Sequence, residues 1–136
     1  QGLLERLLEL LGVYRALDRV LLASHQDHIL RQVRKMAPEM PTNFGYQEAR
    51  ELILRADKGD FSGYVPPAPA LQIPPRREGR KLVTPELTRA AHSLGVEVHV
   101  WTVNEARQAR SLLQMGADGI MSDDAEMLAA LSRDVG

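Results

Sequence analysis

The chain has 136 residues, of which 44% are hydrophobic and 26% charged, as is typical of a single soluble globular domain. Its formal net charge of −1 excludes an overall field that would attract nucleic acid or an anionic membrane. The absence of cysteine excludes disulfides and thiolate metal sites, and no apolar run is long enough to span a bilayer. We therefore expect one domain over residues 1–136, with a cytoplasmic location as the default.

Hydrophobic periodicity predicts a helix followed by five strand–helix units. Leucines recur at helical spacing from Leu3 to Leu11, Gly12 is a stop signal, and no strand precedes this helix. Short apolar runs bounded by polar residues or prolines then predict strands. The expected strands are residues 19–24, 40–45, 70–73, 97–103 and 119–122. Regular alternation of this kind favours a parallel sheet with right-handed crossovers.

Polar residues at the starts of the expected helices fit N-cap positions. Asp27 can cap the helix after the first strand, and Thr84 followed by Pro85 begins the helix after the proline-rich segment. Asn104 can cap the next helix, and one of two successive aspartates can cap the last. Cap chemistry thus predicts the same helix starts as the hydrophobic spacing.

One local charge cluster lies in the segment rich in proline and glycine. It contains Arg76, Arg77, Arg80 and Lys81. A solvated loop is the favoured interpretation, and an anion-binding patch is the alternative.

The expected strand over residues 97–103 distinguishes two parallel architectures. Alternation gives it a valine face and a mixed polar and aromatic face. The first face contains Val96, Val98 and Val100, and the second contains Glu97, His99 and Trp101. A doubly wound sheet is covered by helices on both sides and would bury the charged face at a cost, whereas a barrel lets polar groups pair in its lumen. We therefore predict an α/β fold, a partial TIM (β/α)8 barrel of about five parallel strands with its helices outside.

Three segments resemble motifs of the glycerophosphodiester phosphodiesterase family, whose fold is a TIM barrel. VHVWTVN, SLLQMGADGI and MSD together resemble the family's last two strands and the helix between them. RVLLASHQDHILRQVRKMAPEMPT is similar to its V-L-x-S-F-D-H strand and the following A-P-x-x-P-T. ALQIPPRREGRKLVTPELTRAAHSLG is similar to its A-x-Q-V-P loop and L-V-T-P helix. The resemblance implies that residues 1–136 are the C-terminal portion of such a barrel, from strand four to strand eight.

The resemblance implies metal-dependent hydrolysis of glycerophosphodiesters to glycerol 3-phosphate and an alcohol, a reaction of lipid metabolism. In the family, two histidines act as general acid and base, and carboxylates hold Ca²⁺ or Mg²⁺. Those groups belong to a His-Arg-Gly motif, acidic residues with a second histidine, and a Glu-x-Lys motif on the first three strands. None of these motifs occurs in this sequence. We therefore expect a truncated chain with no catalytic residue and no metal ligand of its own, inactive when alone.

The resemblance also implies substrate contacts for residues of this chain. Trp101, at the C-terminal end of a strand, is expected to wall the substrate pocket, and an indole that fills the top of the core is the alternative. Gln72 matches the family's A-x-Q position and is expected at the mouth of the barrel. Asn104 is expected either to border the substrate or to shape the turn. His25 and His28 invite a metal or acid–base role, but the favoured interpretation is that they are structural and exposed.

Two alternatives stay open. Five strands leave two open sheet edges, which proteins normally cover. The chain could therefore be a non-catalytic half-barrel module that self-associates into a homo-oligomer. GADGI also occurs in other phosphate-binding barrels, so a different phosphate-handling barrel is the weaker alternative.

Overall fold

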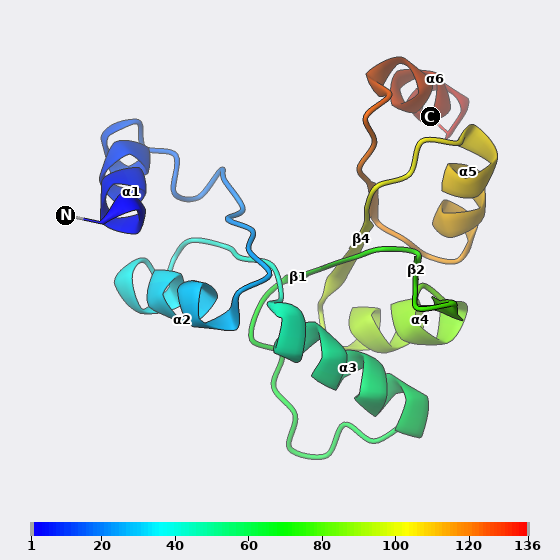
Figure 1. Ribbon diagram of the computed structural model, residues 1–136, viewed down its shortest axis with the longest axis horizontal. Coiled ribbons are helices and arrows are strands. Elements are labelled where there is room, and N and C mark those ends of the chain that lie inside the picture. The colour runs from blue at the N-terminus through cyan, green and yellow to red at the C-terminus, as the bar shows by residue number, and fades with distance from the viewer. Residues whose placement is uncertain (1, 136) are drawn as a thin grey trace.

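The computed structural model describes residues 2–135, and within these residues it contains six helices and five strands (Figure 1). The helices are α1 (Leu3–Val13), α2 (Asp27–Met36), α3 (Tyr46–Lys58), α4 (Pro85–Ser93), α5 (Ala106–Gln114) and α6 (Ala125–Val135). The strands are β1 (Ala70–Ile73), β2 (Arg76–Arg77), β3 (Arg80–Lys81), β4 (Glu97–Val100) and β5 (Gly119–Ile120). No helix in this part of the chain is long and apolar enough to cross a membrane.

The main sheet is parallel and has three strands in the order β1, β4, β5. Its register pairs Gln72 with His99, and His99 with Gly119. β2 and β3 form a separate antiparallel hairpin, in a segment that the sequence predicted to be a loop. The predicted α/β class with parallel strands is confirmed, but this sheet has three strands where about five were expected.

The two other expected strands form isolated parallel bridges instead of regular strands, at Leu22–Thr42 and Asn43–Ala70. The Leu22 N–H donates to the Pro41 carbonyl at 2.9 Å, and the Asn43 N–H donates to the Leu22 carbonyl at 3.2 Å. The next donor, the N–H of Ser24, bonds to the side-chain oxygen of Asn43 at 3.0 Å. Because a side chain takes the place of a backbone carbonyl there, regular pairing stops after these two bonds.

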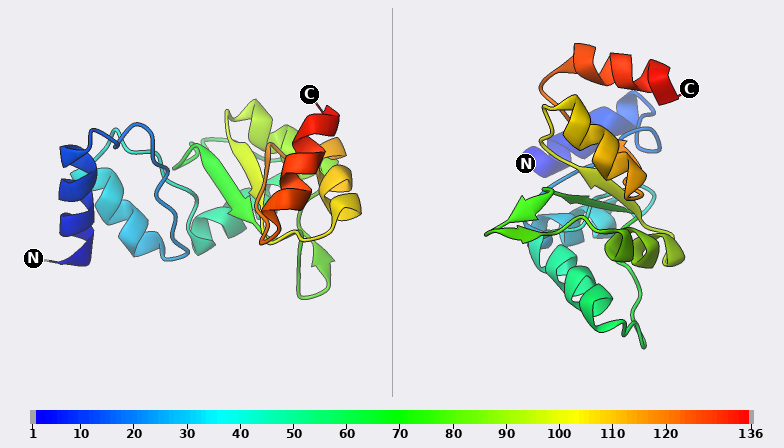
Figure 2. Two further views of the ribbon diagram at one scale, coloured as in Figure 1. Left: turned by 90° about the horizontal axis from the view of Figure 1, so that it is seen from above. Right: turned by 90° about the vertical axis from the view of Figure 1, so that its right-hand side faces the viewer.

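The helices form an arc along one side of the strands (Figure 1). α1 and α2 lie at the left of this view, α3 and α4 at the bottom, and α5 and α6 at the right. The left view of Figure 2, seen from above, shows the same separation between the N-terminal helix pair and the rest. Buried apolar side chains form two clusters: the larger joins the sheet to α3, α4, α5 and α6, and the smaller joins α1 to α2.

The two faces of β4 differ as the alternation predicted. Val98 and Val100 are fully buried in the larger cluster. On the opposite face Glu97 is exposed, His99 is half-buried and Trp101, just past the strand, is 43% exposed. Helices therefore cover one face of this strand, and the other face, called the inner face below, is open.

Two predicted helix caps are confirmed. The Thr84 hydroxyl oxygen accepts from the Leu87 N–H at 3.2 Å, with Pro85 at the first helical position of α4. In α6 the Met127 N–H donates to the Asp124 carboxylate at 2.9 Å. Each cap satisfies a backbone donor that the helix itself leaves unpaired.

Asp27 does not cap α2 as predicted but caps the start of α3 instead. Asp27 lies inside the first turn of α2, and its carboxylate accepts from the N–H groups of Gln47 and Glu48 at 3.2 and 3.1 Å. It can reach them because the N-cap of α3 is Gly45: a Cβ there would lie 2.5 Å from an Asp27 oxygen. The predicted stop at Gly12 is also wrong, since α1 continues to Val13.

α2 and α3 are joined by the side chain of Arg34. Its two terminal nitrogens contact both carboxylate oxygens of Glu48 at 2.7 and 3.0 Å. Its Nε donates to the Thr42 hydroxyl and one terminal nitrogen also donates to the Asn43 carbonyl, both at 3.0 Å. The Arg34 and Glu48 side chains are only 22% and 16% exposed. One guanidinium thus links α2, α3 and the segment that pairs beside β1.

Candidate functional site

The C-terminal ends of β4 and β5 lie side by side and are joined by Asn104. Its side-chain oxygen accepts from the Ser122 hydroxyl and the Asp123 N–H, both at 2.9 Å, and its amide nitrogen donates to the Asp123 carboxylate at 3.0 Å. The predicted cap of α5 by Asn104 is wrong, because Glu105 occupies the N-cap and no side chain caps that helix. Asn104 instead fixes the rim at the strand ends, where parallel α/β folds place their functional groups.

Trp101 lies on the same rim. Its backbone N–H donates to the Ile73 carbonyl at 3.2 Å, which places it beside the end of β1. Its peptide bond to Thr102 is cis. With 43% of its surface exposed, the indole does not fill the top of the core. It presents a large apolar surface at the open end of the inner face.

A hydrogen-bonded row crosses the inner face below this rim. The Gln72 amide nitrogen lies 3.1 Å from His99 Nδ1, and His99 Nε2 lies 2.9 Å from a carboxylate oxygen of Glu97. The sequence predicted Gln72 near this end of the strands but no partner for His99, since Glu97 is two residues away along the strand. A long side chain on the same face spans that distance. The spacing Glu-x-His was the only signal of this pair in the sequence.

The described residues do not fit a divalent cation. Such an ion requires several converging oxygen ligands, and within residues 2–135 no three histidine, aspartate or glutamate side chains are arranged to hold a metal. His25 and His28, which flank the start of α2, are both exposed. Any metal chemistry therefore needs ligands from outside this set of residues.

A second histidine–carboxylate pair lies at the opposite ends of the strands. Asp118 accepts from the Val98 N–H at 2.7 Å and contacts His92 Nε2 at 2.8 Å. Partial burial raises the pKa of the Asp118 carboxyl, but the hydrogen bonds from Val98 and His92 outweigh it, so the pKa lies below its ordinary value. The pair ties α4 to β4 and to the segment before β5, which is a structural role away from the rim.

The basic cluster forms the β2–β3 hairpin, and two of its four cations are held by α3. Arg80 contacts the Asp57 carboxylate at 2.5 Å, and the Arg77 guanidinium lies 4.7 Å from the centre of the Tyr46 ring. Arg76 donates to the Gly79 carbonyl of its own turn at 2.9 Å. These contacts fasten the hairpin to α3 and favour the structural interpretation of the cluster over an anion-binding patch.

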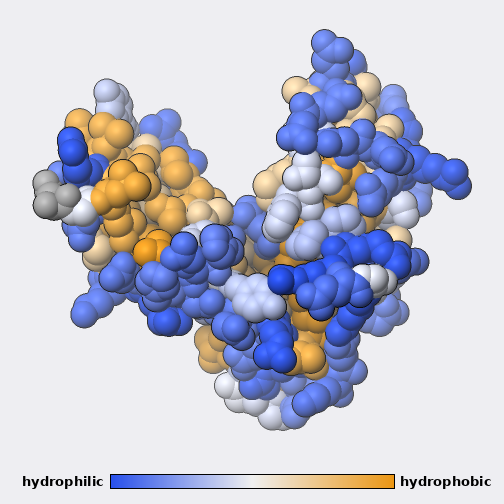
Figure 3. All heavy atoms as spheres, viewed as in Figure 1, coloured by the Kyte–Doolittle hydropathy of each residue, from blue (hydrophilic) through white to orange (hydrophobic). Residues whose placement is uncertain are grey.

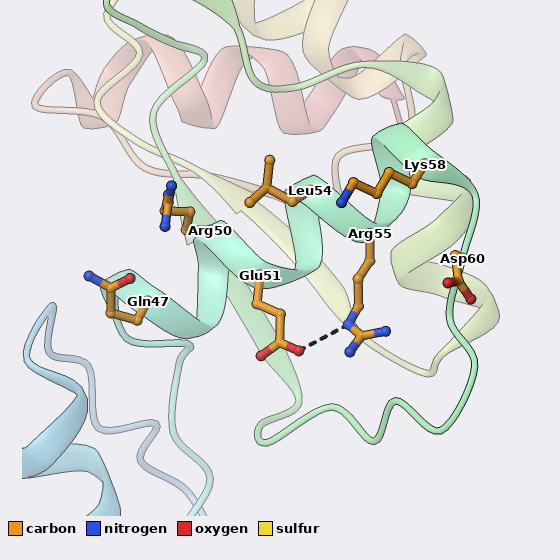
Figure 4. A pocket seen from close by; sticks show the side chains of 7 residues that line it. All are labelled: Gln47, Arg50, Glu51, Leu54, Arg55, Lys58 and Asp60. Carbon is orange, nitrogen blue, oxygen red and sulfur yellow. Dashed lines mark hydrogen bonds and ion pairs between the residues drawn. The ribbon is translucent and has the colours of Figure 1, made fainter.

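A hollow of about 500 Å³ lies along the exposed side of α3 (Figure 4). Its walls include the ion pair between Glu51 and Arg55 at 2.9 Å, together with Leu54 and Lys58. The hollow is open to solvent and is built from one helix and the turn after it. It lies away from the strand ends, so the rim around Trp101 stays the candidate site.

The chain is an α/β protein, since parallel strands alternate with helices. Its candidate site lies at the C-terminal ends of the strands, where the open face carries a polar row and an exposed tryptophan. Comparison with protein families makes the assignment specific. The chain belongs to the glycerophosphoryl diester phosphodiesterase family, whose family model matches residues 3–127.

Individual relatives agree with this membership. A glycerophosphodiester phosphodiesterase of Caldanaerobacter subterraneus subsp. tengcongensis is 29% identical over 136 residues, which cover 97% of this chain and 50% of that protein. A Mycobacterium tuberculosis protein described as glycerophosphodiester phosphodiesterase 2 is 41% identical over 58 residues, 43% of this chain and 22% of that protein.

Two solved structures described as phosphodiesterases of this kind are similar in fold. One, from Silicibacter pomeroyi, has a TM-score of 0.73 at 26% identity and is matched over 98% of this chain and 44% of its own. The other, from Galdieria sulphuraria, has a TM-score of 0.68 at 21% identity, over 95% of this chain and 50% of its own. The chain therefore spans about half the length of the relatives that it matches from end to end.

Proposed function

We propose that this chain is the C-terminal part of a glycerophosphodiester phosphodiesterase barrel, contributing its strands four to eight. The observation that carries the proposal is the open inner face of β4, which presents a polar row and ends at the exposed Trp101. Family membership over residues 3–127 supports the activity. The match to 50% of a whole relative supports the assignment to one part of the barrel.

The reaction proposed for the complete barrel is hydrolysis of a glycerophosphodiester in the cytoplasm, as part of lipid metabolism. Water forms a bond to phosphorus, the bond from phosphorus to the alcohol oxygen breaks, and a proton passes to the leaving alkoxide. The products are glycerol 3-phosphate and an alcohol. Ca²⁺ or Mg²⁺, when bound, neutralises charge on the phosphate oxygens. Because residues 2–135 contain no fitting ligand cluster, we propose that the cation and the acid–base groups are held outside this chain, which is inactive alone.

The residues of this chain bind substrate in the proposed barrel. The Trp101 indole covers the carbon atoms of the glycerol, since it offers a wide apolar surface at the strand ends. The carboxamide of Gln72 hydrogen-bonds a glycerol hydroxyl. Asn104 borders the substrate through the loop that it holds, because its own polar atoms bond to Ser122 and Asp123.

The fluorescence of Trp101 tests this proposal, because it is the one tryptophan in the chain. Titration of the chain with glycerophosphocholine is expected to change the indole emission saturably. Gln72→Ala removes one hydrogen bond and is expected to weaken binding about threefold to tenfold, the range for a neutral hydrogen bond of about 1 kcal/mol.

Gln32→Ala is the matched control, since Gln32 is exposed on α2, and it should titrate like the unmodified chain. The chain with Ca²⁺ or Mg²⁺ is expected to release no glycerol 3-phosphate. Indole emission that stays unchanged at millimolar glycerophosphocholine contradicts the substrate-binding role. Release of glycerol 3-phosphate faster than by the Trp101→Ala variant contradicts the proposal that the catalytic groups lie outside this chain.

The self-associating half-barrel stays an alternative because α1 has an exposed apolar surface. Leu3, Leu10, Val13 and Tyr14 are 86%, 54%, 78% and 69% exposed. Figure 3 shows apolar atoms gathered over the arm that contains α1 and α2. Surface of this kind is normally covered by another part of a protein or by a partner. We propose that in this alternative a second copy covers it and the open sheet edges.

Sedimentation velocity from low to high micromolar concentration separates the two functions. The alternative predicts a concentration-dependent dimer that Leu10→Glu converts to monomer, since a buried charge in an apolar interface is costly. Gln32→Glu, on the exposed side of α2, should leave the dimer intact. A monomer throughout the range would exclude the alternative.

A further inference from the structure

The row of Glu97, His99 and Gln72 contains a residue to which the proposed reaction assigns no part. We propose that His99 is a positioning residue, which sets the end of the Gln72 carboxamide that faces the open side of the sheet. The inference rests on the proposed function for the identity of the ligand. The geometry that carries it lies wholly within this chain.

The carboxylate of Glu97 determines where the ring carries its hydrogen. An ionised carboxylate can only accept hydrogen bonds. His99 Nε2 lies 2.9 Å from it and must therefore be the protonated nitrogen. The Glu97 side chain is 67% exposed, whereas that of His99 is 20% exposed, so the carboxylate is solvated while the ring lies against the sheet.

The ring in turn determines the orientation of the amide. In a neutral imidazole with hydrogen on Nε2, Nδ1 has a lone pair and can only accept. The structure places the Gln72 amide nitrogen 3.1 Å from Nδ1. An NH₂ group only donates, so this contact requires an accepting Nδ1 and a ring with its hydrogen on Nε2. The carbonyl oxygen of Gln72 is then turned away from the ring. Without such a partner, the two orientations of a carboxamide have the same shape and nearly equal energy.

The sheet holds the ring in place for this purpose. His99 is in register with Gln72 on one side and with Gly119 on the other. A Cβ at Gly119 would lie 3.1 Å from His99 Cδ2, closer than ordinary packing allows. The glycine thus leaves room for the ring in the row, and the backbone pairing keeps Nδ1 opposite the Gln72 side chain.

The fixed amide specifies a class of ligand. A carbonyl oxygen turned away from the ring can accept from a hydroxyl group of a ligand on the open face and repels a phosphate oxygen. Trp101 follows His99 by two residues, at the open end of the same face. Together they suit a polyol carbon chain with its hydroxyls, so we infer that this row binds the glycerol end of a substrate and not its phosphate.

Nuclear magnetic resonance of the ¹⁵N-labelled chain tests the positioning role directly. Two-bond ¹H–¹⁵N spectra show which ring nitrogen is protonated, and loss of signals in His99→Gln identifies His99 among the four histidines. The expected result is hydrogen on Nε2. Glu97→Leu and Glu97→Gln should both mix the two tautomers, because a carboxamide can donate to Nε2 as well as accept from it. Gln72→Glu should protonate both nitrogens.

Gln32→Glu is the matched control and should leave the His99 signals unchanged. Hydrogen on Nδ1 in the unmodified chain, or a spectrum that Gln72→Glu does not alter, overturns the proposal. These outcomes do not depend on any activity.

Binding then separates this inference from the proposed function. Glu97→Leu is expected to weaken the binding of glycerophosphocholine about threefold to tenfold in the Trp101 titration. The reason is that the Gln72 carboxamide is then no longer held in one orientation. Glu97→Gln should weaken the affinity in the same way, because its carboxamide does not fix the ring tautomer. If the tautomers respond as expected but no variant affects binding, the positioning role holds and the assignment of this row to glycerol fails.

Discussion

Replacement of Arg34 by methionine is expected to lower the free energy of unfolding by about 2–3 kcal/mol. Methionine retains the apolar stem but removes the guanidinium, which leaves the Glu48 carboxylate, only 16% exposed, without its charged partner. The hydroxyl of Thr42 and the carbonyl of Asn43 also lose a donor. The estimate lies below the full cost of breaking a buried pair because both side chains are partly solvated.

Urea unfolding followed by circular dichroism measures this change. Arg31→Met is the matched control, because Arg31 is an exposed arginine on the same helix, and it should alter stability by less than about 0.5 kcal/mol. Equal midpoints for the two variants would show that the guanidinium network does not stabilise the junction of α2 and α3.

Gly116→Ala is expected to cost about 2–4 kcal/mol, for two independent reasons. Gly116 has φ +101°, a backbone conformation that side chains disfavour, and an added Cβ would lie 2.8 Å from the hydroxyl oxygen of Thr88. That hydroxyl is itself held, because its single hydrogen lies between two carbonyl acceptors, that of Met115 at 2.6 Å and that of Pro85 at 3.1 Å. The threonine therefore has no freedom to move aside.

Gly12→Ala gives a control of opposite sign. Gly12 is helical, has no positive φ, and a Cβ there would meet nothing within 4 Å. Alanine at this position should stabilise the chain by about 0.5–1 kcal/mol. Thermal unfolding of both variants measures the contrast, and a Gly116→Ala chain as stable as the original would refute the account of this turn.

Helices and the central strand were predictable because their signals are local. Thr84 with Pro85 marks a helix start through a hydrogen bond that spans three residues. The alternation of Val98 and Val100 with polar neighbours predicted which face of β4 is buried, because side chains on a strand alternate whatever lies beyond it. The family resemblance, carried by several motifs in order, is confirmed over residues 3–127.

The remaining features depend on contacts between distant segments. The carboxylate of Asp27 caps α3, 20 residues onward, instead of its own helix. Asn43 directs its side-chain oxygen to Ser24 and so ends a ladder that apolar composition alone predicted to continue. In the candidate site, Gln72 and His99 meet across two strands 27 residues apart. A pattern within one segment contains no information about such partners.

Within residues 2–135, each parallel pairing connects a segment to the next parallel segment along the chain. The pairings run from Leu22 to Thr42, from Asn43 to Ala70, and on through β1, β4 and β5, with the β2–β3 hairpin inserted between β1 and β4. Each unit of strand and helix therefore depends on its two immediate neighbours, much as in a repeat protein. An architecture of this kind can be lengthened, duplicated or divided between units, because each segment then keeps at least one of its pairing neighbours. A run of consecutive units can then be a heritable building block in its own right.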